Sequence, residues 1–145
     1  MKKTLISLIS VLFFTACAIP QSPDANKYRF TSLEKVSSFK YRQINNWQAI
    51  DSRSLIININ PSRSYLLILD RNVWAIKYTE QIKISSVNSR VRSNIDLVQV
   101  LNQVSRPGRI ESIYLLPDRE AQRRVRAEIL SEEPEFEALR LDGVI

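Results

Sequence analysis

The stretch SLIININPSRSYLLIL, residues 54–69, contains two apolar runs on either side of a turn signal. Alternation in the first run places Leu55, Ile57 and Ile59 on one face and Asn58 and Asn60 on the other. In the second run, Tyr65, Leu67 and Leu69 share one face, and Leu66 and Ile68 share the other. Between the runs, Asn60-Pro61-Ser62-Arg63 has proline at the second turn position, where its fixed φ is favoured. These features predict a β-hairpin.

Shorter strand patterns flank the hairpin. They cover residues 43–51 around Trp47, 81–87, 95–103 and 108–116. The last two are joined through Ser105-Arg106-Pro107-Gly108, where Pro-Gly indicates a turn. Residues 73–78 are expected to be a loop or a single helical turn. Because the strands follow one another without βαβ alternation, we expect a mainly β fold of the α+β class. It is a small antiparallel meander or a partly closed barrel of about five to six strands.

Residues 28–39 precede the strands and have a different spacing. Phe30, Leu33 and Val36 recur at a helical interval, and Thr31 or Ser32 is suited to cap the first turn. We expect a short helix in this segment.

An amphipathic helix is predicted over residues 118–130, after Pro117. Ala121, Val125 and Ile129 recur every four residues, and Asp118 is suited to cap the start. Its outer face carries Arg119, Arg123, Arg124 and Arg126, and Glu120 is placed to pair with Arg124. Two interpretations of this basic face stay open: a surface that binds anions or a membrane, or a solvated face whose apolar stripe covers the sheet.

The first residues have the parts of an export signal. Lys2 and Lys3 precede an apolar core over residues 5–14. A membrane-spanning helix needs about 20 apolar residues, and the polar stretch that begins at Pro20 follows too soon for a span.

The end of this leader, Phe14-Thr15-Ala16-Cys17, resembles the lipobox of bacterial lipoproteins. The resemblance implies cleavage before Cys17, a diacylglyceryl group on its thiol and an acylated new amino terminus, which together hold a protein durably to a membrane. Ala18, rather than Asp, resembles an outer-membrane sorting signal, with the protein facing the periplasm. The alternative is an ordinary secretory signal cut after Ala16. We therefore divide the chain into a signal peptide (1–16), an anchor and tether (17–38), one mainly β domain (39–130) and an acidic tail (131–145).

Charge is distributed unevenly along the chain. Residues 18–130 hold 18 basic and 10 acidic residues, whereas residues 131–145 hold one basic and five acidic residues. A basic body favours contact with anionic envelope surfaces such as lipid head groups, lipopolysaccharide or peptidoglycan, and we expect no nucleic acid partner. The alternative is a charged surface that only keeps the protein in solution.

The residue inventory restricts the chemistry. The chain has no histidine and one cysteine, Cys17, so an internal disulfide, a His-metal site and a nucleophile triad are excluded. No carboxylate pair has a recognisable catalytic spacing, and Gly108 and Gly143 are too few for a phosphate-binding loop. We expect a protein that is not an enzyme and that uses no cofactor or metal.

The most specific polar cluster is Asp51-Ser52-Arg53, close to Trp47 and just before the hairpin. In a binding site, Trp47 would stack on a ligand while Arg53 holds an anionic group. In a structural turn, Asp51 would accept backbone hydrogen bonds and pair with Arg53. Both interpretations stay open.

The stretch over residues 39–116 resembles a family of short exported bacterial proteins of unknown function, often lipoproteins, whose core has a Trp followed by Asp-x-Arg. The resemblance is carried by Ile44-x-x-Trp47-x-x-Ile50-Asp51-x-Arg53, Tyr65-Leu66-Leu67-x-Leu69, Ile95-Asp96-x-Val98-x-Val100 and Arg109-Ile110-x-x-Ile113. Many members have a cysteine just before the last Arg-Ile, where this chain has Gly108, so any disulfide of those relatives is absent here. The resemblance supports location and fold and implies no reaction.

Two functions of an envelope lipoprotein anchored through Cys17 follow as hypotheses. The first is a non-catalytic structural or accessory protein that docks a partner protein. The second is a binding module for an anionic envelope ligand, namely lipopolysaccharide, peptidoglycan or phospholipid head groups. The candidate ligand-binding residues are Trp47, Asp51, Arg53, Arg119, Arg123 and Arg126.

Overall fold

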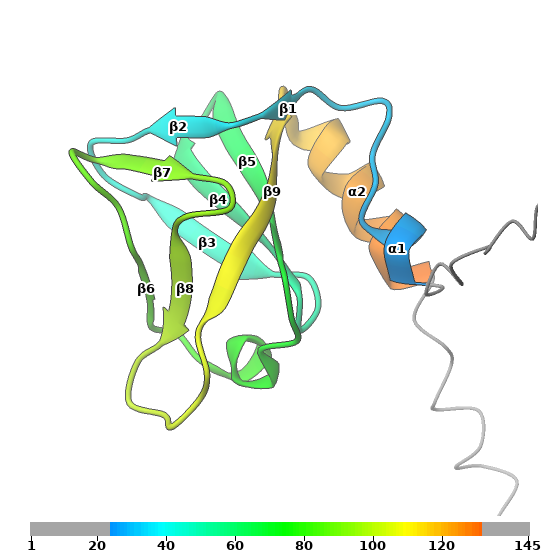
Figure 1. The fold of residues 1–145 in the computed structure, drawn as a ribbon. Helices are drawn as coiled ribbons and strands as arrows, with labels where there is room; N and C mark the ends of the chain where they lie inside the picture. The colour runs from blue at the N-terminus through cyan, green and yellow to red at the C-terminus, as the bar shows by residue number, and fades with distance from the viewer. Residues whose placement is uncertain (1–23, 132–145) are drawn as a thin grey trace, which may run out of the picture.

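The computed structural model of the chain describes residues 24–131. The leader, the lipobox with Cys17, the start of the expected tether (residues 18–23) and nearly all of the acidic tail lie outside the described residues. The described part is mainly β: an antiparallel sheet curled into a half-barrel, with the helix α2 (Arg119–Ser131) packed on its outside (Figure 1). The predicted fold class, a partly closed barrel with a C-terminal helix, is confirmed.

The main sheet has seven strands, and six of them are hydrogen-bonded in the order β3-β4-β5-β9-β8-β6. Their bounds are β3 Asn46–Ala49, β4 Ser54–Asn60, β5 Arg63–Leu69, β6 Ile82–Ile84, β8 Leu97–Val100 and β9 Gly108–Leu116. The short β1 (Lys35–Val36) pairs with β9, and β2 (Ser38–Lys40) pairs with β7 (Arg90–Arg92) in a separate ribbon. All of these pairings are antiparallel.

The predicted hairpin is the pair β4 and β5. Ser54 pairs with Ile68 at one end and Asn60 pairs with Arg63 at the turn. The Asn60 side-chain oxygen accepts hydrogen bonds from the Ser62 amide (3.0 Å) and hydroxyl (3.1 Å), so asparagine closes the turn together with proline. The faces inferred from the alternation are also confirmed: Leu55, Ile57, Tyr65, Leu67 and Leu69 enter one core, whereas Leu66 and Ile68 enter another.

The strand order differs from the meander that was one of the two expected topologies. β9 lies between β5 and β8, and it pairs with β5 from Ser64–Leu116 to Leu69–Ile110. β9 has nine residues with a largely buried pattern, so it can pair along the whole of the seven-residue β5. The three residues of β6 are too few to do so. Residues 43–51, 81–87 and 95–103 contain shorter strands than expected, whereas 108–116 is β9 from end to end.

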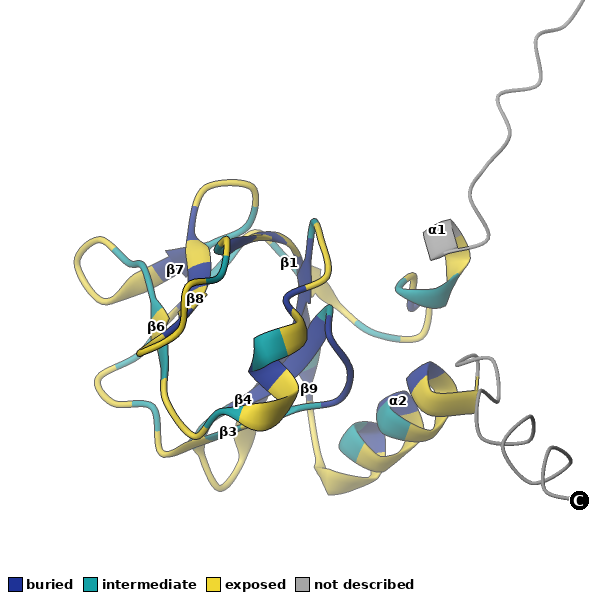
Figure 2. Ribbon diagram, turned by 90° about the horizontal axis from the view of Figure 1, so that it is seen from below, coloured by how far each residue is buried: buried dark blue, intermediate teal, exposed yellow. Residues whose placement is uncertain are grey.

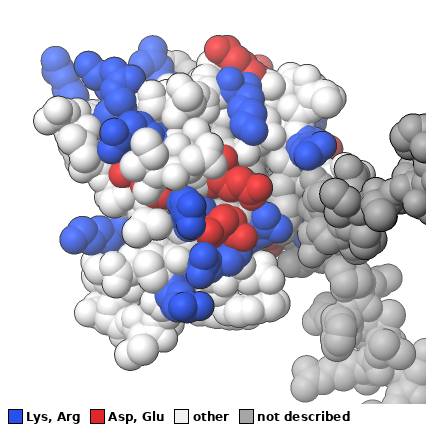
Figure 3. All heavy atoms as spheres, viewed as in Figure 1, with Lys and Arg blue, Asp and Glu red and all other residues white. Residues whose placement is uncertain are grey.

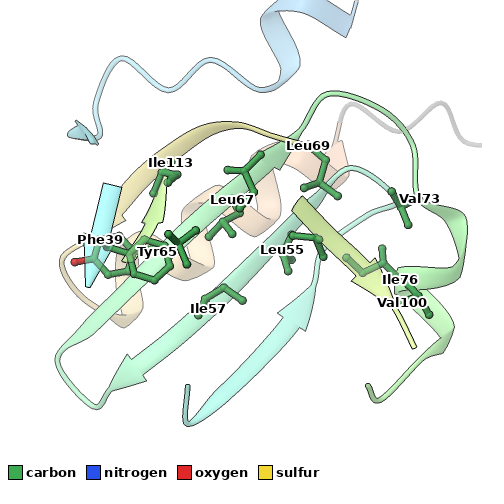
Figure 4. Packing of buried hydrophobic residues seen from close by; sticks show 13 residues of the cluster. Phe39, Leu55, Ile57, Tyr65, Leu67, Leu69, Val73, Ile76, Val100 and Ile113 are labelled. Atoms are coloured by element: carbon green, nitrogen blue, oxygen red, sulfur yellow. The ribbon is translucent and has the colours of Figure 1, made fainter. Parts of the chain in front are cut away.

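Two hydrophobic cores lie on opposite faces of the central strands. The inner core fills the curled side of the sheet and includes Leu55, Ile57, Tyr65, Leu67, Leu69 and Ile113 (Figure 4). Phe39, from β2, stacks on Tyr65 with ring centroids 4.3 Å apart, so the ribbon closes one end of this core. The outer core joins Ile56, Leu66 and Ile68 to α2. Both faces of β4 and β5 are therefore buried, which accounts for their nearly continuous apolar sequence.

The helix expected over residues 28–39 is not formed. α1 (Asp24–Lys27) ends before this segment, which instead passes through a turn into β1 and β2. Phe30 enters the outer core, where its ring meets Tyr114 edge-on at 5.3 Å, and Val36 packs on the inner core. Their helical spacing was misleading because the two side chains belong to opposite faces of the sheet. Residues before position 39 thus already belong to the packed domain.

Residues 74–78 form a single helical turn, one of the two alternatives expected for residues 73–78; it is a 3-10 turn named η1 (Trp74–Tyr78). Val73 and Ile76 anchor it in the inner core. Gly108, at the start of β9, lies directly against it: a Cβ at this position would be 2.9 Å from methyl carbons of both Val73 and Leu69. Glycine therefore permits the close approach of β9 to the segment before η1.

Helix α2 agrees with its prediction. Ala121, Val125 and Ile129 are buried, and the Asp118 carboxylate accepts a hydrogen bond from the Ala121 amide (2.7 Å) as an N-cap. Figure 2 shows the resulting stripe of buried residues on one side of the helix. The expected ion pair of Glu120 with Arg124 is replaced by one with Arg123, at 2.7 Å.

Candidate functional site

A polar groove of about 670 Å³ runs between the N-terminal half of α2, the turn end of the β4–β5 hairpin and β3. We call it the arginine groove. It is lined by Asn45, Gln48, Asn58, Asn60, Pro61, Ser64, Arg119, Gln122, Arg123 and Arg126. Among these lining residues three are basic and none is acidic, so the groove is a positively charged, hydrogen-bonding surface.

The alternation of β4 explains where the groove begins. Along its outer face, Ile56 packs beneath α2, and Asn58 and Asn60 follow on the same face as the strand approaches the turn. The same face of β5 also changes from apolar to polar toward the turn, from Leu66 in the outer core to Ser64 in the groove. The outer core therefore gives way to polar side chains at the end of the hairpin that faces the start of α2.

The floor of the groove is organised by side-chain hydrogen bonds. The Ser64 hydroxyl donates to the Asn58 side-chain oxygen at 2.7 Å, and the Gln122 amide nitrogen donates to the Ser64 hydroxyl at 2.9 Å. The same Gln122 nitrogen lies 3.5 Å from the Asn58 oxygen. These bonds join β4, β5 and α2 and fix the amides before any ligand binds.

The three arginines have different surroundings. Arg126 donates to the Gln48 side-chain oxygen and so joins α2 to β3. Arg123 pairs with Glu120 on the exposed side of the helix. The Arg119 side chain makes no hydrogen bond or ion pair with any other residue in the described range 24–131. Its guanidinium is thus the one of the three best able to meet an incoming anion.

The groove has the chemistry to hold an oxygen-rich anion. Guanidinium groups bind carboxylates and phosphates through paired N–H donors, and neighbouring amides can donate to or accept from hydroxyl groups. The sequence indicated the arginines, but the amides and Ser64 were missed. Asn58 and Asn60 were visible as polar positions in an apolar strand, yet only the fold brings them opposite α2.

Asp51 occupies a separate, structural centre. Its buried carboxylate accepts hydrogen bonds from the Ser54 hydroxyl (2.7 Å), the Tyr28 hydroxyl (2.8 Å) and the Arg53 amide (2.9 Å), and Lys27 Nζ lies 3.3 Å away. Burial alone would raise the pKa of Asp51. The hydrogen bonds and the lysine charge outweigh burial, so the pKa lies below its ordinary value.

Arg53 and Trp47 are not brought together with Asp51 into one site. The Arg53 guanidinium lies over the Tyr28 ring, 4.9 Å from its centroid, and donates to the Leu69 carbonyl (2.6 Å) and to Glu111 (2.9 Å). In the view of Figure 3, basic and acidic side chains are intermingled on the middle of the molecule. Trp47 packs against the inner core instead. The turn in which Asp51 accepts the Arg53 amide is present, but the side-chain pair between them is replaced by Arg53–Glu111.

Two further observations are limited to residues 24–131. No group of three or more His, Cys, Asp or Glu side chains is placed to hold a metal ion within that range. None of its helices is long and apolar enough to cross a membrane.

Comparison with known proteins adds a family. No curated protein and no solved structure matches the chain. A family of unknown function, DUF6491, matches residues 1–132, which includes the whole described fold and both the arginine groove and the Asp51 centre. A family of unknown function was expected from residues 39–116, and the match extends well beyond that stretch. This chain therefore belongs to the DUF6491 family of unknown function.

Proposed function

We propose that this protein is a lipid-anchored envelope protein whose arginine groove binds an anionic glycan. The observation that carries the proposal is the gathering of Arg119, Arg123 and Arg126 with five side-chain amides around one groove that no acidic residue lines. Electrostatics alone would favour any anion, so the class of ligand follows from the rest of the lining.

The lining favours a sugar over a lipid. Amide and hydroxyl side chains match the hydroxyl and acetamido groups of a glycan, and the arginines match its phosphates or carboxylates. Pro61 is the only apolar residue among those that line the groove, so an acyl chain would have no wall to pack against. A phosphorylated or carboxylated envelope glycan fits both properties.

Binding is tested with purified lipopolysaccharide and with soluble peptidoglycan fragments. In isothermal titration calorimetry, Arg119→Gln and Arg126→Gln are each expected to weaken binding about 10-fold or more, because each removes a charge-assisted hydrogen bond. Affinity should also fall as salt is raised. The matched control is Arg124→Gln, which removes the same charge from the same helix outside the groove and is expected to leave affinity nearly unchanged.

Equal losses in the three variants would contradict a defined site and indicate attraction to the general basic charge. Absence of binding to both probes, with the wild-type protein folded, would overturn the proposal. The Arg126 variant also loses its bond to Gln48, so Arg119 provides the cleaner comparison.

The anchor is a separate part of the proposal and has its own test. Cells that express the protein and are fed a palmitate analogue are expected to label the wild type and not Cys17→Ser. The reason is that the Cys17 thiol is the only one in the chain to which a lipid can be joined. Lack of label on the wild type would contradict the anchor without affecting the groove.

A further inference from the structure

One end of the molecule exposes large apolar side chains that the fold does not cover. Trp74 is 67% exposed, Tyr78 78%, Leu101 38%, and Val104 is fully exposed. The first two come from η1, and the others come from the loop between β8 and β9. We call these four residues the end patch.

Hydrogen bonding and packing hold the two segments side by side. The Leu101 amide donates to the Gln81 carbonyl at 3.1 Å, just after η1, and Gly108 approaches Val73, just before it. Figure 1 shows η1 and the β8–β9 loop at the same end of the half-barrel, and in Figure 2, which looks from that end, η1 faces the viewer. The four residues therefore lie at the same end of the molecule.

The fold directs these side chains outward. Val73 and Ile76 anchor η1 in the inner core, so Trp74 and Tyr78 project from the other side of the turn. Exposed residues near them include the basic Lys77 and Arg106 and the acidic Glu80. The lobe at this end is largely uncharged in Figure 3.

This composition matches the boundary of a bilayer. Trp and Tyr place an apolar ring among acyl chains and a polar tip among head groups, and lysine and arginine extend toward anionic head groups.

We propose that the end patch contacts the surface of a lipid bilayer, with Trp74 and Tyr78 at the level of the head groups. This contact goes beyond glycan binding in the groove. It agrees with the proposed anchor, because only residues 18–23 separate Cys17 from α1, and an extended chain spans at most about 3.5 Å per residue. An anchored domain would stay beside the membrane.

The test uses Trp74 as its own reporter. Trp47→Phe leaves Trp74 as the only tryptophan, and the full protein is reconstituted into vesicles of phosphatidylethanolamine and phosphatidylglycerol. The emission maximum of Trp74 is expected to lie at a shorter wavelength in the vesicles than in protein kept in detergent-free buffer. It should also be quenched when acyl chains brominated near the head group replace ordinary ones.

The control moves the reporter away from the patch. In Trp47→Phe with Trp74→Phe and Val87→Trp, the tryptophan stands on another exposed turn, and its emission is expected to be unchanged by the brominated lipid. Equal quenching of both reporters would overturn the patch as the contact surface. So would an unquenched Trp74 in protein that has joined the vesicles, since the patch would then face a protein or solvent. Neither result changes the prediction for glycan binding to the Arg119 and Arg126 variants.

Discussion

Replacing Leu67 with alanine is expected to lower the free energy of unfolding by about 2–5 kcal/mol, the range for truncating a fully buried leucine. Leu67 is at 0% exposure in the inner core, and its strand is paired on both sides, with β4 and β9. The neighbouring strands cannot collapse into the space without breaking their register, which places the effect toward the upper part of that range. Urea denaturation followed by circular dichroism measures it.

The matched control is Leu97→Ala in β8, where the same atoms are removed from an exposed side chain. Its expected effect is within about 1 kcal/mol, because little apolar surface returns to water. A similar loss in both variants would mean that the inner core is less tightly packed than the structure shows.

Replacing Asp51 with alanine is expected to cost about 2–4 kcal/mol, although its side chain is small. The change leaves the Ser54 hydroxyl, the Tyr28 hydroxyl and the Arg53 amide without their acceptor and leaves Lys27 without a counter-charge. Glu128→Ala, on the exposed side of α2, removes a carboxylate with an expected change below about 0.5 kcal/mol. Unchanged stability in Asp51→Ala would reject a structural role and favour a binding role for this residue.

The pH dependence of stability gives a second readout of Asp51. Its pKa is lowered in the folded protein, so its contribution is fully present above the unfolded value of about 3.9. The contribution is lost as pH falls through the lower, folded value. Denaturation at a series of acidic pH values is therefore expected to show a smaller loss of stability in Asp51→Asn than in the wild type, since asparagine does not titrate.

The sequence alone predicted the strands and the helix whose hydrophobic pattern extends over many residues. β4, β5, β9 and α2 were predicted because seven or more residues repeat one period and each has a turn or cap at its end. The strands β1, β2 and β7 have two or three residues, too few for alternation to appear. Their pairing is decided by the strands they meet, as with Val36 opposite Ile113.

The residues of the candidate site also differ in whether a local sequence pattern could identify them. Arg119, Arg123 and Arg126 were evident from helical spacing, whereas Asn45, Gln48 and Ser64 join them only through tertiary structure. Trp47 and Arg53 lie six positions apart, but their side chains meet different surroundings, the inner core for Trp47 and the Tyr28 ring for Arg53. Proximity in sequence was a poor guide there, because a turn lies between them.

The position of β9 between β5 and β8 also determines how the chain can fold. The β4–β5 hairpin is local in sequence and can form early. The strand that pairs with the other edge of β5 is β9, which lies more than 40 residues later in the chain. Until then, β5 presents an unpaired edge with apolar side chains on both faces, the kind of edge that joins other chains. During folding, pairing of β9 with β5 therefore competes with aggregation through the exposed edge of the β4–β5 hairpin.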